Sequence, residues 1–241
     1  MKVNNAKIII LSLIALFAIH GLYLYFTDKL NFYIHPRYSW LSVTASAITL
    51  MVTMMGIIQE ILLSKKRKRK PKNKIKIDEL IIFGFAILVA FLLPVKALTS
   101  ATASQRQGNL NSLRGDSTEI SSPFKISTEN YSLGDWIISL QNNPDSSTYD
   151  GKKVNIDGFI FPDEASDADH FTIARFILTC CAVDATPVGI RVYSKNWNRK
   201  YNKDDWVKLS GEFKIDPSTN KIFIFAEKLE VTEVPNDPYI Y

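Results

Sequence analysis

The sequence predicts a membrane protein in two parts, three transmembrane α-helices followed by an all-β, OB-like small barrel with a short helix. The long apolar runs of the 241-residue chain lie before residue 98. Charge divides at the same point: residues 1–98 carry 14 Lys and Arg against 4 Asp and Glu, a balance of +10, and residues 99–241 carry 15 against 20, a balance of −5. The second part alternates apolar and polar residues between Gly, Pro and Asn turns, as strands do.

Three apolar segments are long enough to cross a bilayer. Residues 8–26 are 19 residues without a formal charge, close to the roughly 20 that a membrane-spanning helix needs. Residues 40–63 and 80–98 form the second and third segments. The first ends in bulky aromatic residues rather than a small-residue cleavage site, so we interpret it as an uncleaved anchor. We therefore expect residues 1–98 to form a membrane domain.

The connecting loops predict the orientation. Residues 64–79 contain nine Lys or Arg, whereas the loop at residues 27–39 contains only Lys29 and Arg37. Positive charge in short loops stays in the cytoplasm, so the N-terminus and the 64–79 loop are expected inside, the loop near anionic membrane lipid. The chain after residue 98 is then expected outside the cell membrane.

The remainder is expected to form a tether and one small domain. Residues 99–124 are rich in Ser, Thr, Asn, Gly and Gln, which predicts a flexible linker before a domain at residues 125–241. Ser132 and Asp135 have the spacing of a helix-capping box. Predicted strands cover residues 153–161, 171–180, 188–193, 206–215 and 221–231. Gly158 and Gly211 indicate bends or bulges, so we favour a five-stranded OB-like barrel, with a sandwich fragment as the alternative.

The two cysteines, Cys180 and Cys181, are adjacent, so they do not form a disulfide framework. Neighbouring side chains of a regular strand point to opposite faces and cannot both hold one ion. If the strand has ended, a turn can bring Cys181 and Asp184 together. Zinc prefers thiolate and imidazole ligands, with carboxylate as a lesser one, which gives Cys180, Cys181, Asp184 and His170 as candidate zinc ligands. Packing in the core and thiol redox chemistry remain alternatives.

Three further residues are candidates for binding. Arg175 interrupts an apolar strand, so it either faces solvent, pairs with Asp157 or Asp184, or contacts a ligand. His20 lies within the first apolar segment, and His35 lies in the loop that follows it. Polar residues at these places often face another membrane subunit, so both histidines are candidate partner contacts.

Several motifs resemble the YcgQ-like family of permease subunits. Residues 171–189, with their Cys-Cys-x-x-Asp-Ala stretch, are the most specific of these. Residues 33–38 resemble the family's loop between its first two spans, residues 149–154 with Gly158-Phe159 resemble its domain opening, and residues 235–241 resemble its C-terminal tail. The resemblance implies a large multi-span permease as partner, and it points to zinc homeostasis. The 64–79 loop departs from the family by being unusually basic.

These observations predict an accessory permease subunit whose outer domain presents or gates substrate. One alternative is a stand-alone extracytoplasmic metal sensor or chaperone, and another is a thiol-redox enzyme. Catalysis is not expected, because the sequence carries no phosphate loop, zinc-protease motif or Ser/His/Asp spacing. Nucleic acid is not an expected partner, because the second part is acidic and phosphate binding needs clustered Lys and Arg.

Overall fold

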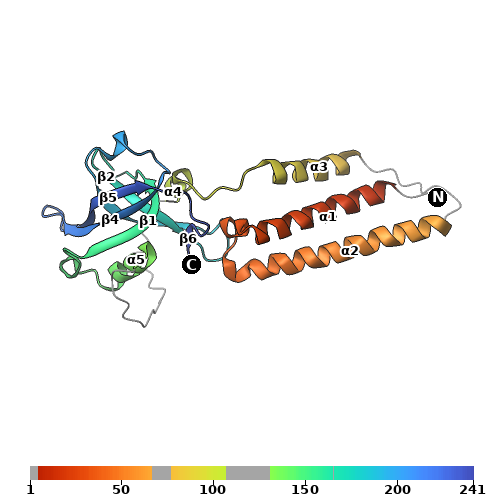
Figure 1. The fold of residues 1–241 in the computed structure, drawn as a ribbon, viewed down its shortest axis with the longest axis horizontal. Helices are drawn as coiled ribbons and strands as arrows, with labels where there is room; N and C mark the ends of the chain where they lie inside the picture. The colour runs from red at the N-terminus through yellow and green to blue at the C-terminus, as the bar shows by residue number, and fades with distance from the viewer. Residues whose placement is uncertain (1–4, 67–76, 107–130, 165) are drawn as a thin grey trace. The chain divides into compact units, whose positions relative to one another are not determined.

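The protein is described here from a computed structural model that covers residues 5–66, 77–106, 131–164 and 166–241. The chain divides into two compact units, Met1–Lys96 and Ala97–Tyr241. Figure 1 shows the three long helices in the first unit, and the strands with two short helices in the second.

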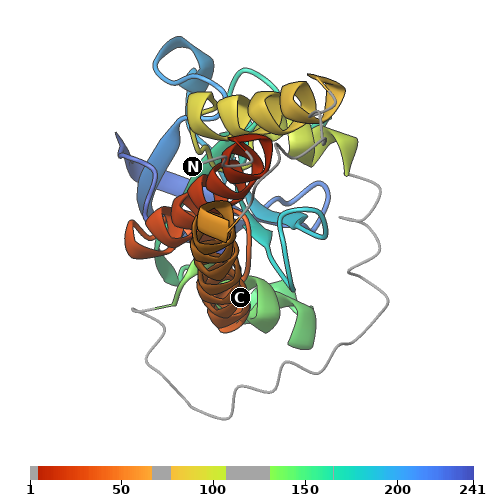
Figure 2. The same cartoon turned by 90° about the vertical axis from the view of Figure 1, so that its right-hand side faces the viewer.

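The first unit consists of α1 (Asn5–Phe26), α2 (Ser39–Lys66) and α3 (Ile77–Leu92), with the short 3-10 helices η1 (Lys29–Phe32) and η2 (Pro36–Tyr38) between the first two. The helix α1 lies between the other two in both views (Figure 1 and Figure 2). Large apolar side chains point outward from all three helices. Among them are Phe17, Met54 and Phe85.

Two of these helices are long and apolar enough to span a membrane, over Lys7–Phe26 and Pro36–Leu63. The predicted third segment needs a correction, because α3 ends at Leu92 and not at residue 98. Leu93 and Pro94 follow, and proline disfavours helical backbone in the residue before it, here Leu93. With 16 residues, α3 is about 24 Å long, which is shorter than the roughly 30 Å hydrocarbon core.

The second unit contains six strands. They are β1 (Lys153–Phe161), β2 (His170–Ile177), β3 (Thr186–Tyr193), β4 (Trp206–Ile215), β5 (Ile222–Val231) and β6 (Tyr239–Ile240). The first five follow the order β1-β4-β5-β3-β2, and pairing between β1 and β2 closes the sheet. Only the β3–β5 pair in this ring is parallel. This is a closed five-stranded mixed barrel of the OB-like type, so the barrel prediction is confirmed and the sandwich alternative is wrong.

The strand boundaries differ from the sequence prediction around the cysteines. The predicted strand 171–180 ends at Ile177, and the strand predicted from residue 188 begins at Thr186. The last residue pair between β2 and β3 joins Ile177 to Thr186, and beside it lies β6, a two-residue strand that the sequence did not indicate. It runs parallel to the end of β2, and the backbone N–H of Leu178 then donates to the carbonyl of Ile240 at 2.9 Å.

The barrel interior is closed by the short helix α5 (Leu133–Asn142). Its Trp136 ring lies 4.9 Å from the ring of Phe213 between centroids, and both side chains are buried. The predicted capping box is confirmed, because Ser132 and Asp135 each accept a backbone hydrogen bond from the other. The helix therefore begins where the sequence indicated.

A bulge lets β4 curve around the barrel. The register between β4 and β5 shifts between Ser210 and Gly211, which confirms the bend predicted from this glycine. A Cβ atom at Gly211 would lie 2.2 Å from the carbonyl oxygen of Phe225, so only glycine allows the two backbones to approach this closely.

A second apolar cluster lies outside the barrel interior, under α4 (Ser100–Gln105). It contains Phe159, Phe161, Ala174, Phe176, Leu178, Ala185, Trp206 and Tyr239. Ala103 of α4 is fully buried against them, and the backbone N–H of Ser100 donates to Asp204 at 2.5 Å. The tether predicted over residues 99–124 is therefore wrong at its beginning, where the chain packs on the barrel. Residues 107–124 lie outside the described residues.

Candidate functional site

The β2–β3 connection, residues 178–185, brings Cys180, Cys181 and Asp184 together; we call it the thiol loop. Because β2 ends at Ile177, the two cysteines are freed from strand alternation, and their sulfur atoms lie 3.7 Å apart. One ligand atom from each of the three residues lies within 4.8 Å of the others. Both cysteines are free thiols, and Cys180 is exposed. The sequence allowed a shared ion only if the strand ended before the cysteines, and the structure meets this condition.

Asp184 organises the thiol loop. Its carboxylate accepts the backbone N–H of Cys180 at 2.8 Å and that of Cys181 at 3.2 Å, while its own N–H donates to the Cys181 carbonyl at 3.1 Å. Burial alone would raise the pKa of Asp184, but hydrogen bonds from the Cys180 thiol and from the backbone N–H groups of residues 179–181 outweigh it and lower that pKa. The carboxylate is therefore ionised at neutral pH.

The same carboxylate controls the neighbouring thiol. Hydrogen bonds from Cys180 to Asp184 and to Cys181 stabilise the protonated thiol and raise its pKa from the ordinary 9.0 to about 11. A thiolate is the nucleophile and the metal ligand, so Cys180 is a weak nucleophile at neutral pH. A divalent cation would have to displace protons from the thiols in order to bind.

The sequence did not single out Arg106, which follows α4 as its C-cap. Its guanidinium Nη1 donates to the carbonyl of Ala182 at 3.2 Å and to that of Ala185 at 2.6 Å. The two acceptors flank the turn that carries Asp184. An arginine inside an apparent tether gives no local signal of this role, because α4 and the thiol loop are about 76 residues apart in the chain.

Comparisons with known proteins bear on both units. Residues 7–109 match the model of the DUF1980 N-terminal domain, and residues 101–241 match that of the DUF1980 C-terminal domain. The chain belongs to the DUF1980 family. The two matches overlap over residues 101–109, which include most of α4.

A relative of this DUF1980 chain occurs in Streptococcus mutans serotype c (strain ATCC 700610 / UA159). It is 21% identical over 262 residues, covers 92% of this chain and 94% of its own length, and is named "Putative two-component membrane permease complex subunit". Among solved structures, the second OB-fold domain of replication protein A from Methanococcus maripaludis covers 36% of this chain and 91% of its own, at 14% identity and a TM-score of 0.20. The barrel assignment rests on the strand order.

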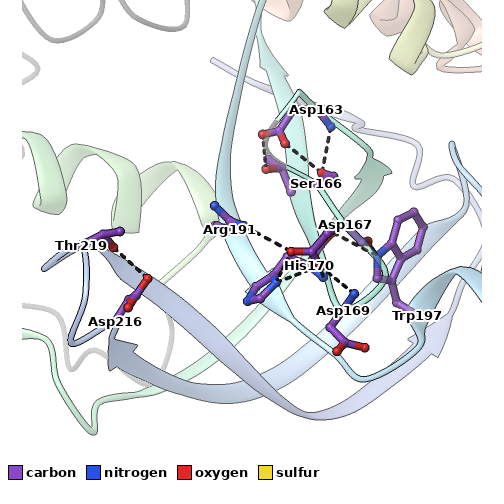
Figure 3. A network of polar contacts seen from close by, with 10 residues as sticks. Asp163, Ser166, Asp167, Asp169, His170, Arg191, Trp197, Asp216 and Thr219 are labelled. Carbon is purple, nitrogen blue, oxygen red and sulfur yellow. Dashed lines mark hydrogen bonds and ion pairs between the residues drawn. The ribbon is translucent and has the colours of Figure 1, made fainter.

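His170 lies apart from the thiol loop in this DUF1980 chain, at the opposite end of β2. The eight residues of that strand separate the two ends by roughly 25 Å at about 3.3 Å per residue. The imidazole Nδ1 is 2.9 Å from the Asp167 carboxylate, which also lies 3.9 Å from Arg191 (Figure 3). The carbonyls of Asp167 and His170 both accept from the Trp197 indole (Figure 3). His170 is therefore not brought to the predicted metal site.

Arg175 of β2 links this strand to β1. It forms an ion pair with Asp157, which was one of the alternatives, and its guanidinium lies 5.3 Å from the centre of the Trp206 ring. Its side chain is 14% exposed. Because the positive charge of Arg175 is already paired with Asp157, we do not assign Arg175 as a ligand-binding residue.

The two histidines of the first unit contact the chain itself. The His20 ring packs on Phe91 of α3 at 4.5 Å between centroids. The Nδ1 of His35 accepts the backbone N–H of Arg37 at 2.9 Å and so caps η2. His20 therefore lies at a contact between α1 and α3, and His35 fixes the turn before α2.

Proposed function

We propose that this DUF1980 chain is an accessory subunit of a membrane permease, anchored by its helices and carrying the barrel on the outer side. The observation that carries the proposal is similarity along both units to the Streptococcus mutans protein, whose name describes a subunit of a two-component membrane permease complex. The two candidate spans support it, because only 6% of each apolar window is buried within the structure. Such open apolar surface needs lipid or another membrane protein.

The third crossing is part of the proposal. With about 24 Å of helix, α3 spans a bilayer only if the membrane thins or the flanking residues extend into the interface. Lys96 can do so by extending its amine toward the interface. An odd number of crossings, with the nine Lys and Arg of residues 64–79 in the cytoplasm, then puts the barrel outside.

Assembly is tested by mild-detergent extraction of the tagged full-length chain from its own membranes, followed by mass spectrometry. We expect a multi-span membrane protein to co-purify in near-equal amount. A Cys180→Ser, Cys181→Ser chain is the matched control and should recover the same partner, because the helices make the complex. Recovery of this chain alone from both preparations would refute the proposal.

Orientation can be tested with the native thiols, because Cys180 and Cys181 are the only cysteines in the chain. A membrane-impermeant maleimide should label intact cells, and the double serine chain should give no signal. Permeabilised cells supply the control for thiol reactivity. Labelling that requires permeabilisation would place the barrel inside and remove the proposed outer role.

The barrel's contribution to transport is a second, separable proposal: the thiol loop binds a thiophilic divalent cation such as zinc and presents it to the permease. Two thiols and a carboxylate within 4.8 Å favour it, since soft thiolates select zinc and copper over calcium or magnesium. Three protein ligands leave a coordination position open, which suits a cation that is passed on rather than kept. The raised pKa of Cys180 disfavours the thiol-redox alternative.

A further inference from the structure

The thiol loop is held by Arg106, which lies in the segment that follows the first unit in the chain. Arg106 is the only described residue after α3 and before α5 that donates a side-chain hydrogen bond to this loop. Its two acceptors are backbone carbonyls on either side of Asp184. A charged donor bridging both sides of a turn limits how far the turn can open.

The helix α4, which Arg106 follows as its C-cap, is itself fixed to the barrel at its start and its middle. At its start, Ser100 donates to Asp204, and the backbone N–H of Leu98 donates to the hydroxyl of Tyr239 at 3.2 Å. At its middle, Ala103 is fully buried in the second apolar cluster. A six-residue helix is not stable alone, so these contacts and those of Arg106 keep α4 in place.

The second apolar cluster joins α4 to the loop a second time. Ala103 of α4 and both Leu178 and Ala185, the ends of the thiol loop, are buried in it. A change in the shape of the loop therefore acts on α4 through packing as well as through Arg106. Only seven residues, 93–99, separate α4 from the end of α3.

We propose that Arg106 is a positioning residue for the thiol loop and that α4 relays the state of this loop toward the membrane helices. Resting on the cation binding proposed above, the relay has a direction: an ion that ties Cys180, Cys181 and Asp184 together stiffens the loop and strengthens the docking of α4. Coupling of this kind is reciprocal, so loosening either element loosens the other. An accessory subunit would thereby report cation loading to the permease.

The test is hydrogen–deuterium exchange of the full-length chain in detergent, followed in peptides that cover residues 97–106 and 178–186. Without metal, Arg106→Ala is expected to speed exchange about tenfold in both peptides, because two charge-assisted hydrogen bonds are lost. Arg106→Lys should restore part of the protection. Arg199→Ala, which removes an exposed arginine of η7 (Trp197–Arg199), is the control and should change neither peptide.

A second variant separates the relay from local packing. Asp184→Asn loosens the thiol loop without touching α4, and it should still speed exchange in residues 97–106. With zinc added, the parent chain should gain protection in both peptides, whereas Arg106→Ala should gain it in the loop alone. Unchanged loop exchange in Arg106→Ala would overturn the positioning role, and unchanged α4 exchange in Asp184→Asn would overturn the relay. A chain that binds no zinc would refute the cation-binding proposal. The metal-free comparisons would still decide whether Arg106 positions the thiol loop and whether the loop and α4 are coupled.

Discussion

The loops at the two ends of β2 are each shaped by an aspartate, but they differ in the side chains that they offer to a ligand. At each end an aspartate accepts backbone N–H groups and shapes a loop: Asp184 serves the thiol loop, and Asp167 serves the loop before the strand. Burial would raise the pKa of Asp167, but the N–H of Asp169 and the imidazole and N–H of His170 lower it. Both carboxylates are thus ionised and used by their own loops.

The difference lies in what remains available to a ligand. At the start of β2, the imidazole of His170 is hydrogen-bonded to Asp167 (Figure 3) and is flanked by the rings of Tyr193 and Phe223. At the end of β2, the exposed thiol of Cys180 lies beside the half-buried thiol of Cys181, with their sulfur atoms 3.7 Å apart. The same strand therefore separates a hydrogen-bonded polar network from a pair of free thiols.

The largest expected effect is the loss of cation binding at one end only. Cys180→Ser, Cys181→Ser should weaken zinc binding by the full-length chain at least about a hundredfold, since loss of outer-shell partners alone costs 10–100-fold elsewhere. Titration against a chromophoric chelator at fixed pH measures this. His170→Ala is the matched change at the other end and should leave the affinity as it was. An equal loss in both chains would mean that the two ends are not distinct.

The next effect is the reactivity of Cys180. Asp184→Asn removes the acceptor that raises its pKa, which should fall from about 11 toward 9.0. A complete return to 9.0 would raise the thiolate fraction at pH 8 about a hundredfold, and the lower nucleophilicity of a less basic thiolate would reduce the gain in rate to about tenfold; the contacts with Cys181 remain, so about tenfold is the upper limit. Alkylation by iodoacetamide, followed by mass spectrometry, should be faster in the variant, by up to about tenfold. Asp167→Asn should show the parent rate, and a parent rate in Asp184→Asn would contradict the assigned hydrogen bond.

The sequence was sufficient where the determinants are local. The Ser132–Asp135 capping box and the bulge at Gly211 involve near neighbours or a single backbone requirement, and both were predicted. The pairing of Arg175 with Asp157 was one of several alternatives, because burial demands a partner for the charge without specifying which.

The parts that the sequence did not reveal depend on distant contacts. Residues 178–181 continue the apolar pattern of β2, but the strand ends at Ile177, where β6, about 60 residues later, pairs with it and accepts the N–H of Leu178. The helix α4 has a small, polar sequence typical of a tether, and it is ordered by burial of Ala103 under the second cluster. The gathering of the thiols and the role of Arg106 follow from these two contacts, so neither could be read locally.

A smaller effect is expected from the middle of β2. Arg175→Ala should lower the free energy of unfolding of the barrel by about 1–2 kcal/mol, through lost packing on Trp206 and a charge left on Asp157. The half-exposed carboxylate limits the contribution of the ion pair itself. Urea unfolding followed by tryptophan fluorescence measures the change. Arg191→Ala, at a side chain 41% exposed, should cost less than about 0.5 kcal/mol.

The smallest effect is the response of the metal-free thiol loop to pH, and its sign follows from the two pKa changes. The raised pKa of Cys180 means that the fold favours the protonated thiol, so this stabilisation is complete below pH 9.0 and is lost as pH rises through about 11. The lowered pKa of Asp184 means that the fold favours the ionised carboxylate. This stabilisation is complete above the ordinary pKa of 3.8 and is lost as pH falls below it. Proteolysis of the loop, normalised to an unstructured peptide of the same sequence, should therefore be slowest between these limits. In Cys180→Ser the alkaline rise should disappear while the acid rise stays, because only the carboxylate remains to titrate; an alkaline rise of the same size in that variant would assign the effect to another group.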